Sequence, residues 1–256
     1  MGNIHTLLKL TFLFLFSGIT ATAQVTPGKE KPKSLEHTFY VAGNIGNDLT
    51  GEGQKVLKAI VEASKSDEVA TLLVPGNFLP SKGFPQEGER EAQKQFLKKN
   101  LLDAVQEFNG KVVFTPGQNE WTKGGQNRID DLESFLQDNQ SNIEVWPDDG
   151  CPIEKEDITD DLVLVTVDTQ WYLENWDDYQ NEEHRYLRGR LETLASQFDN
   201  VIFVSGKDQN LQYLEDDGIP QIISGSTGKP KKLSIRKENE HFGTTKSGYA
   251  KLKLYK

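Results

Sequence analysis

The 256-residue chain is poor in the residues that build disulfides and imidazole metal centres. It contains a single cysteine, Cys151, and four histidines, of which His5 lies close to the start. One cysteine excludes an intramolecular disulfide and any cysteine-rich zinc site. The remaining imidazoles are few for a metalloenzyme, and Cys151, in a Gly-Cys-Pro turn, is expected to be inert rather than reactive.

Long apolar runs are equally scarce, and the most pronounced one spans residues 10–19, after a short, weakly basic lead that contains Lys9. This run is too short to cross a bilayer stably. It is followed by Ala21-Thr22-Ala23, small residues at the positions that a signal peptidase reads. We therefore expect residues 1–23 to be a secretory signal cut before Gln24, rather than an uncleaved anchor. The mature product is expected to be exported, periplasmic or secreted, with no later transmembrane segment and no lipid-modified cysteine.

Positive charge is in deficit, because 29 lysines and arginines face 39 aspartates and glutamates, a net charge of −10. An acidic surface repels phosphate backbones and anionic lipids. Nucleic acid is therefore not an expected partner, and neither is an anionic membrane surface. The hydrophobic fraction of 36% is large enough for a buried core, which excludes wholesale disorder.

Residues 24–36 read as a polar, flexible leader, and residues 37–256 as one domain without repeats or a long linker. In this domain apolar runs alternate with amphipathic stretches, which indicates an α/β fold whose sheet is buried on both faces. The C-terminal strands suggest that the sheet is mixed. Strands are expected at 38–42, 71–74, 111–115, 162–167, 201–204 and 221–223, with an edge strand at 247–255 and helices near 54–64, 88–108, 129–136 and 187–198.

One pattern recurs where the expected strands end. Four of them end in a glycine followed by polar residues, at Gly43-Asn44, Gly76-Asn77, Gly117-Gln118-Asn119 and Gly206-Lys207-Asp208-Gln209. Ligands of α/β sheets bind beyond the carboxyl ends of strands, and glycine there allows sharp turns and close backbone approach. The four corners are expected to converge on one pocket if the strands are neighbours. Ordinary strand-to-loop turns are the alternative.

These four corners resemble those of the calcineurin-like metallophosphoesterases, whose loops carry G-D-x-G, G-D-N-x-Y, G-N-H-D and G-H-x-H. Segments that look like an exported bacterial branch of that family are 82–85, 150–154, 168–173, 210–213 and 224–229. The resemblance extends from Phe39 to the C-terminus. It implies a four-layer α/β/β/α sandwich with central mixed sheets and a two-metal site at the strand ends.

The chain departs from the family at the residues that would hold the metals. Asn44 and Asn77 stand where the resemblance implies metal-binding aspartates, Gln118 where it implies a metal-binding asparagine, and Asn119 where it implies the catalytic histidine. Lys207 and Gln209 replace the last two histidine ligands. A further histidine-containing segment expected between residues 174 and 200 is missing, and His184 is the only imidazole there.

These departures remove the chemistry that the family would use. Two adjacent divalent ions require carboxylates for charge and imidazoles as firm donors, whereas amides are neutral and an ammonium repels cations. Without metal no hydroxide nucleophile forms near neutral pH, and an amide at Asn119 cannot act as an acid. The sequence therefore predicts a pseudoenzyme without metal cofactors, which binds an unidentified protein or a small anionic ligand.

Two alternatives remain open. Asp48, Glu120, Asp168 and Asp208 lie beside the corners and could hold one Mg²⁺ or Ca²⁺, or they could be solvated acids. Lys207 among glycine-rich turns could hold a phosphorylated ligand without cleaving it, or it could pair with Asp208 or Glu120.

Aromatic residues follow the strand that ends at Asp168. We expect Glu120, Asp168 and Trp171 to form a wall of the pocket. Trp171, Tyr172, Trp176 and Tyr179 are expected to cover the end of the sheet rather than to stack on a ligand. The segment 224–229 lacks phosphate-loop spacing and is interpreted as a structural turn.

Overall fold

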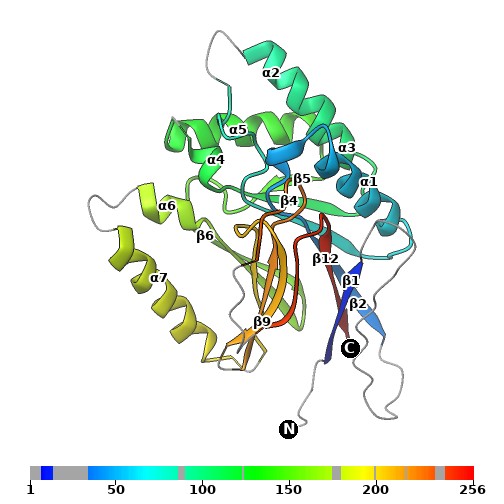
Figure 1. The fold of residues 1–256 in the computed structure, drawn as a ribbon, viewed down its shortest axis with the longest axis vertical. Helices are drawn as coiled ribbons and strands as arrows, with labels where there is room; N and C mark the ends of the chain where they lie inside the picture. The colour runs from blue at the N-terminus through cyan, green and yellow to red at the C-terminus, as the bar shows by residue number, and fades with distance from the viewer. Residues whose placement is uncertain are drawn as a thin grey trace.

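A mixed six-stranded sheet forms the centre of the protein (Figure 1). The computed structural model describes residues 7–13, 34–85, 90–122, 124–174, 180–198, 200–216, 218–233 and 240–256. Strands β2 to β5 run parallel, while β12 pairs antiparallel with both β1 and β2. The strand order is β1 (Leu7–Leu13), β12 (Tyr249–Tyr255), β2 (Leu35–Val41), β3 (Ala70–Pro75), β4 (Lys111–Thr115) and β5 (Ile143–Val145).

The C-terminal strand β12 is internal to this sheet, and the expectation of an edge strand there is wrong. Its other neighbour, β1, falls within the predicted signal segment. Residues 14–33, which hold the predicted cleavage point and most of the leader, lie outside the described residues. So do Trp176, Tyr179 and the side chain of His184.

A second, four-stranded sheet packs against the central one. Its order is β11 (Glu240–Thr244), β9 (Leu211–Asp216), β10 (Ile219–Ser224) and β8 (Phe203–Ser205), and only β10 and β8 run parallel. The two sheets share an apolar cluster built around Val41, Ile222, Ala250 and Leu252. Neighbouring sheets of mixed direction covered by helices confirm the α/β class and the mixed sheet.

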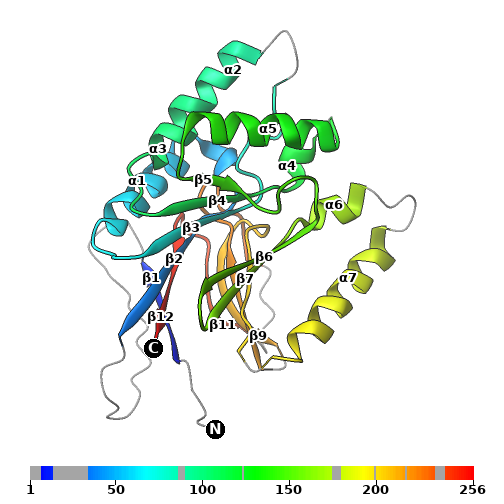
Figure 2. The ribbon, with the colours of Figure 1, turned by 180° about the vertical axis from the view of Figure 1, so that it is seen from behind.

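Helices cover the opposite face of the central sheet (Figure 2). The expected helix over 88–108 is helical over residues 90–105, with a π-helical turn, η2 (Lys98–Leu102), between α2 (Arg90–Leu97) and α3 (Asp103–Val105), and residues 106–108 lie beyond its end. Together with α1 (Glu52–Ser64) and α5 (Gln126–Asn139), these elements bury the main core. Fully buried members of that core are Tyr40, Leu57, Leu72, Leu101 and Leu132.

The apolar run at 162–167 was expected to form a strand buried on both faces, and this is wrong. It forms β7 (Leu162–Val167) in a separate antiparallel pair with β6 (Ile153–Thr159). Val163 and Val165 on its outer face are 47% and 53% exposed. Helices α6 (Thr169–Glu174) and α7 (Gln180–Ala195) follow this pair. None of the helices that the structure describes has the length and apolar character needed to cross a membrane.

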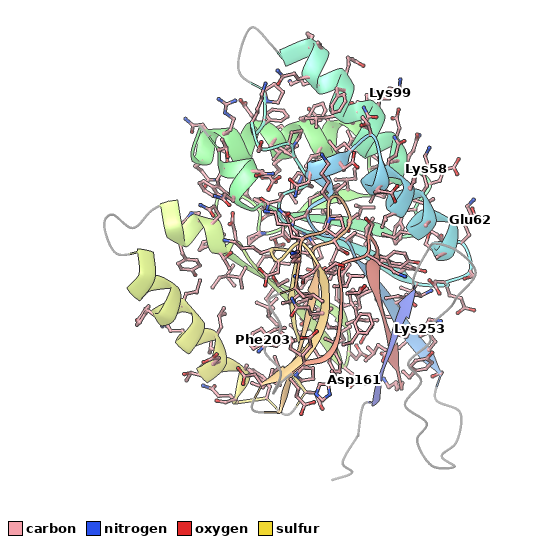
Figure 3. The ribbon with its side chains drawn as sticks, viewed as in Figure 1. Lys58, Glu62, Lys99, Asp161, Phe203 and Lys253 are labelled. Carbon is pink, nitrogen blue, oxygen red and sulfur yellow. The ribbon has the colours of Figure 1, made fainter. Side chains whose placement is uncertain are left out.

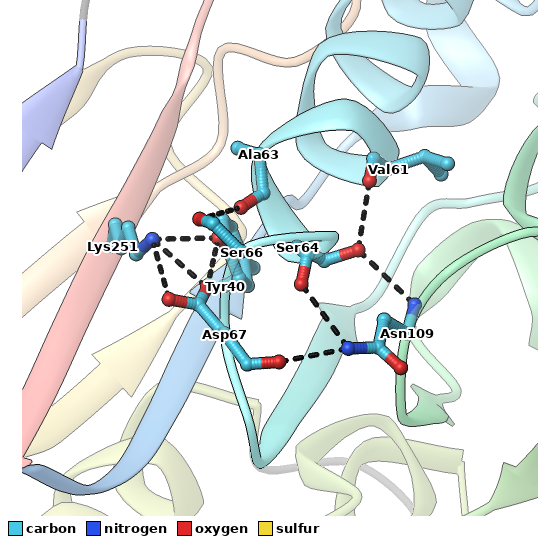
Figure 4. A network of polar contacts seen from close by, with 8 residues as sticks. All are labelled: Tyr40, Val61, Ala63, Ser64, Ser66, Asp67, Asn109 and Lys251. Carbon is cyan, nitrogen blue, oxygen red and sulfur yellow. Dashed lines mark hydrogen bonds and ion pairs between the residues drawn. The ribbon is translucent and has the colours of Figure 1, made fainter.

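A buried polar network anchors the end of α1 to β2 and β12 (Figure 4). Tyr40 Oη donates a hydrogen bond to Asp67, and Lys251 Nζ lies 2.7 Å from Tyr40 Oη and 2.9 Å from the Asp67 carboxylate. Asp67 and Lys251 are buried. Burial lowers the pKa of Lys251, and the hydrogen bond and charge of Asp67 oppose that effect. The ion pair thereby fixes the loop before β3 to the strand at the other side of β2.

Candidate functional site

The four glycine corners meet, as the sequence predicts for neighbouring strands. A Cβ on Gly43 would lie 2.5 Å from the Cα of Gly206, and a Cβ on Gly117 would lie 2.9 Å from the Cα of Gly76. A side chain on Gly206 would collide with the carbonyl oxygen of Pro75. Since no side chain fits between these backbones, glycine is required at the junction, and the corners of β2, β3, β4 and β8 form one unit.

Three side-chain amides fill this junction, and we call Asn44, Asn77 and Asn119 the asparagine cluster. Asn77 Nδ2 donates to Asn44 Oδ1 at 2.9 Å. Asn44 Nδ2 in turn donates to the carbonyl oxygens of Gly206 at 2.5 Å and Lys207 at 3.0 Å. Asn119 Nδ2 donates to the carbonyl oxygen of Leu79 at 2.7 Å. The cluster therefore links the first three corners to one another, and Asn44 connects them to the fourth corner.

Backbone groups at both ends fix the direction of these hydrogen bonds. The N–H of Asn119 donates to Asn77 Oδ1 at 3.0 Å, so the Nδ2 of Asn77 must face Asn44. The carbonyl groups of Gly206 and Lys207 accept only, so Asn44 must present its Nδ2 to them and its Oδ1 to Asn77. Asn44 and Asn77 have φ values of 57° and 54°, a left-handed conformation that asparagine tolerates better than most residues. Both backbone and hydrogen bonding thus favour asparagine at these two positions.

Glu120 lies next to the asparagine cluster and is fully buried. Its carboxylate accepts hydrogen bonds from the backbone N–H groups of Asn77, Leu79 and Gly117 at 2.8–2.9 Å. Burial raises the pKa of Glu120 to about 7, although these N–H donors lower it in part. Glu120 therefore holds the turns of two corners together, and its oxygens point at the backbone.

Asp168 is buried beside Trp121, whose Nε1 donates to Asp168 Oδ2 at 2.7 Å. Its other oxygen accepts from the N–H groups of Gln170 and Trp171, at the start of α6. Burial raises the pKa of Asp168 to about 6, and the three donors oppose this. The half-buried Trp171 ring contacts Tyr172 edge-on, 5.2 Å between centroids. Asp168 thus joins α4 (Gln118–Trp121) to α6.

The remaining predicted site residues lie outside the asparagine cluster. Gln118 and Lys207 are exposed, while Gln209 is half-buried and its carbonyl oxygen accepts from the N–H of Lys231 at 2.6 Å. Glu120 makes no ion pair with Lys207, because its oxygens face backbone N–H groups. Within the residues that the structure describes, Lys207 does not pair with Asp208 either.

The residues present do not fit two divalent ions. The Asn44 oxygen accepts a hydrogen bond from Asn77 and its nitrogen faces two carbonyl groups, so the side chain is held within the junction and offers a cation no negative charge. Among the four acids considered for a rebuilt site, Asp48 accepts from the N–H of Glu52 at 3.1 Å. In the described part of the chain, no three acidic, histidine or cysteine side chains gather into a group that could hold a metal.

Sequence reasoning missed two partners of the site. Trp121 follows Glu120 directly, and a buried indole N–H requires an acceptor, so its pairing with a nearby carboxylate could have been anticipated. Leu79 takes part through its backbone, accepting from Asn119 and donating to Glu120. No side-chain pattern signals that role.

Comparison with known proteins gives a likeness of fold. No protein-family model matches the sequence, and no curated protein matches it. A solved structure described as GAP50, the anchor in the inner membrane complex of Plasmodium, is similar with a TM-score of 0.62 and 16% sequence identity. The similarity covers 85% of this chain and 81% of that chain. At this identity the likeness concerns the arrangement of the backbone, and the chain shares its mixed α/β fold with that structure.

Proposed function

We propose that the chain is a metallophosphoesterase-like pseudoenzyme with a four-layer α/β/β/α sandwich fold. In this proposal the residues at the former metal site hold the strand ends together by hydrogen bonds and bind no metal. In this proposal the exported protein serves as a binding or scaffold protein and catalyses no phosphoester hydrolysis. No residue is assigned a catalytic or metal-binding role.

The hydrogen bond between Asn77 Nδ2 and Asn44 Oδ1 is the observation that carries the proposal. The resemblance implies carboxylates at both positions, and two carboxylates facing each other would need a cation or a shared proton between them. Two amides instead bind each other directly and need no ion. The metal ligands that the resemblance implies at 118, 207 and 209 and the catalytic histidine that it implies at 119 are replaced as well, so the support comes from the whole set.

Metal analysis joined to an activity assay tests the proposal. The purified protein is dialysed against manganese and then against metal-free buffer, and bound metal is measured by mass spectrometry. Hydrolysis of a phosphomonoester and a phosphodiester is followed in millimolar Mn²⁺. We expect much less than one ion per chain and no turnover above the buffer rate. Stoichiometric metal together with turnover would contradict the proposal.

A restored variant provides the positive control. It carries the family's residues at all six positions, Asn44→Asp, Asn77→Asp, Gln118→Asn, Asn119→His, Lys207→His and Gln209→His. We expect this variant to bind manganese and to be stabilised by it, because binding to the folded state raises the unfolding temperature. If neither the parent nor the variant responds to manganese, the assignment of these positions to a former metal site is wrong.

A further inference from the structure

Two loops lie side by side at one edge of the four-stranded sheet. Strands β8 and β10 are parallel, so their carboxyl ends share an edge, and the loops 206–210 and 225–232 follow them. The N–H of Gly225 donates to the carbonyl oxygen of Asn210 at 3.0 Å, and the N–H of Lys231 donates to that of Gln209 at 2.6 Å. The two loops are therefore held against each other by backbone hydrogen bonds.

These loops carry four exposed lysines, which we call the lysine quartet: Lys207, Lys229, Lys231 and Lys232. Asp208 is the single acid in the two loops. Over the described ranges, no carboxylate lies within ion-pair distance of any of the four ammonium groups. In a chain with a net charge of −10, four positive charges on two adjoining loops, none paired with a carboxylate among the described residues, form a local region of positive potential.

Both loops contact Asn44 of the asparagine cluster. The carbonyl oxygen of Lys207 accepts from Asn44, and a Cβ on Gly228 would lie 2.6 Å from the carbonyl oxygen of Asn44. Ser226, in the second loop, is fully buried, and among the residues that the structure describes its hydroxyl meets no hydrogen-bond partner. The stems of the lysines are flexible, but their attachment points are fixed.

We propose that the lysine quartet binds a compact anion that carries two or more adjacent phosphate groups. An ammonium offers three donors and a point charge suited to phosphate oxygens, and several such groups match a ligand with several charges. A long polyanion or an anionic bilayer would also meet the acidic remainder of the surface. A compact anion stays within about one Debye length of the lysines, roughly 8 Å at physiological salt, and responds to the local charges.

Titration calorimetry of the full protein with tripolyphosphate and with inorganic phosphate, in metal-free buffer, tests this inference. We expect tripolyphosphate to bind at least tenfold more tightly than phosphate. The double variant Lys207→Ala/Lys231→Ala should weaken tripolyphosphate binding at least tenfold and should make its affinity less sensitive to salt. All four lysines are exposed, so the variant is expected to fold, which circular dichroism checks.

The matched control is Lys58→Ala/Lys99→Ala, which removes the same charge from the helical layer (Figure 3). Binding by this variant should stay within twofold of the parent. Equal weakening by both double variants would mean that only net charge matters and would overturn the inference, as would equal affinity for phosphate and tripolyphosphate. The calorimetry is done without metal, so its result does not depend on whether the protein hydrolyses phosphoesters in Mn²⁺. Hydrolysis of tripolyphosphate in Mn²⁺ would contradict the proposed function and leave the binding site standing.

Discussion

At the scale of single residues, the asparagine cluster holds the junction by directed hydrogen bonds between uncharged groups. Each amide is both donor and acceptor, so Asn44 and Asn77 can link an N–H group at one end to two carbonyl groups at the other. A carboxylate accepts only, and buried carboxylates are costly without donors or cations. The stability of the junction should therefore depend on the amide nitrogen at each position, even though aspartate has almost the same shape.

Asn44→Asp should destabilise the protein by about 3 kcal/mol or more, because a buried carboxylate would face the carbonyl oxygens of Gly206 and Lys207. Urea unfolding measures the change. The exposed Asn127→Asp is the matched control and should stay within about 0.5 kcal/mol of the parent. Equal stability of Asn44→Asp and the parent would contradict donation from Asn44 Nδ2 to these two carbonyl oxygens.

Trp121→Phe should remove the donor to Asp168 Oδ2 and keep an aromatic ring in place. Since the Trp121 N–H lowers the pKa of Asp168, its loss should move that pKa further above about 6. Carbon-detected NMR titration of the aspartates follows the change. The variant should also lose about 1–3 kcal/mol of stability because the buried carboxylate loses a partner. An unchanged or lower pKa would contradict the hydrogen bond.

At the scale of elements, two kinds of contact hold the strands together: the close packing of the glycine corners and a buried ion pair. The corner after β8 lies so close to the end of β3 that Gly206 cannot carry a side chain. The buried ion pair of Lys251 and Asp67 ties β12 to the loop before β3. One contact is steric and the other electrostatic, so they predict different responses to substitution.

Gly206→Ala should cost about 2–4 kcal/mol, because its methyl group would displace the backbone of Pro75. Gly189→Ala, in α7, meets nothing within 4 Å and should instead stabilise the protein by about 0.5–1 kcal/mol through helix propensity. Thermal and urea unfolding of the two variants should therefore move in opposite directions. Similar shifts in both would indicate that the corners do not touch.

Asp67→Leu should cost about 3–5 kcal/mol, because it leaves the Lys251 ammonium buried without its partner. The double variant Asp67→Leu/Lys251→Met removes both charges and should be clearly more stable than Asp67→Leu alone. A double-mutant cycle by urea unfolding gives the coupling energy. Additive losses would mean that the two side chains do not form the ion pair.

At the scale of the whole molecule, buried acids give stability an unusual dependence on pH. Burial raises the pKa of Glu120 and Glu154 to about 7 and that of Asp168 to about 6. A raised pKa means that the folded protein holds protons that the unfolded chain has lost, so stability falls as pH rises from about 4 to 7. Burial lowers the pKa of His37, so its contribution is lost as pH falls below about 6.5.

The protein should be less stable at about pH 8 than at about pH 6, because three carboxyl groups outweigh one imidazole in this window. Urea unfolding at the two values measures the difference. Glu154→Gln should make the difference smaller, since the amide oxygen still accepts from the N–H of Asp148 but does not titrate. The exposed Glu91→Gln should leave it unchanged. Greater stability at about pH 8 would contradict the raised pKa values.

Much of this architecture could be predicted from sequence, and the failures have local causes. The β-branched run at 111–115 and the glycine corners gave correct strands and a correct junction, because burial and chain reversal leave clear patterns. The β6–β7 pair was missed because Ile153–Thr159 contains four consecutive charged residues that hide its alternation. The direction of the amide hydrogen bonds depends on carbonyl groups from Gly206 and Lys207, more than 160 residues away from Asn44.

The one-way order of donors and acceptors in the asparagine cluster also limits which substitutions the junction can accept one at a time. A single exchange of amide for carboxylate at 44 or 77 would interrupt the chain of hydrogen bonds, so each first step towards a charged centre passes through a weaker fold. Several exchanges would have to occur together. The positions of the junction are therefore mutationally coupled, and they can change as a set more readily than singly.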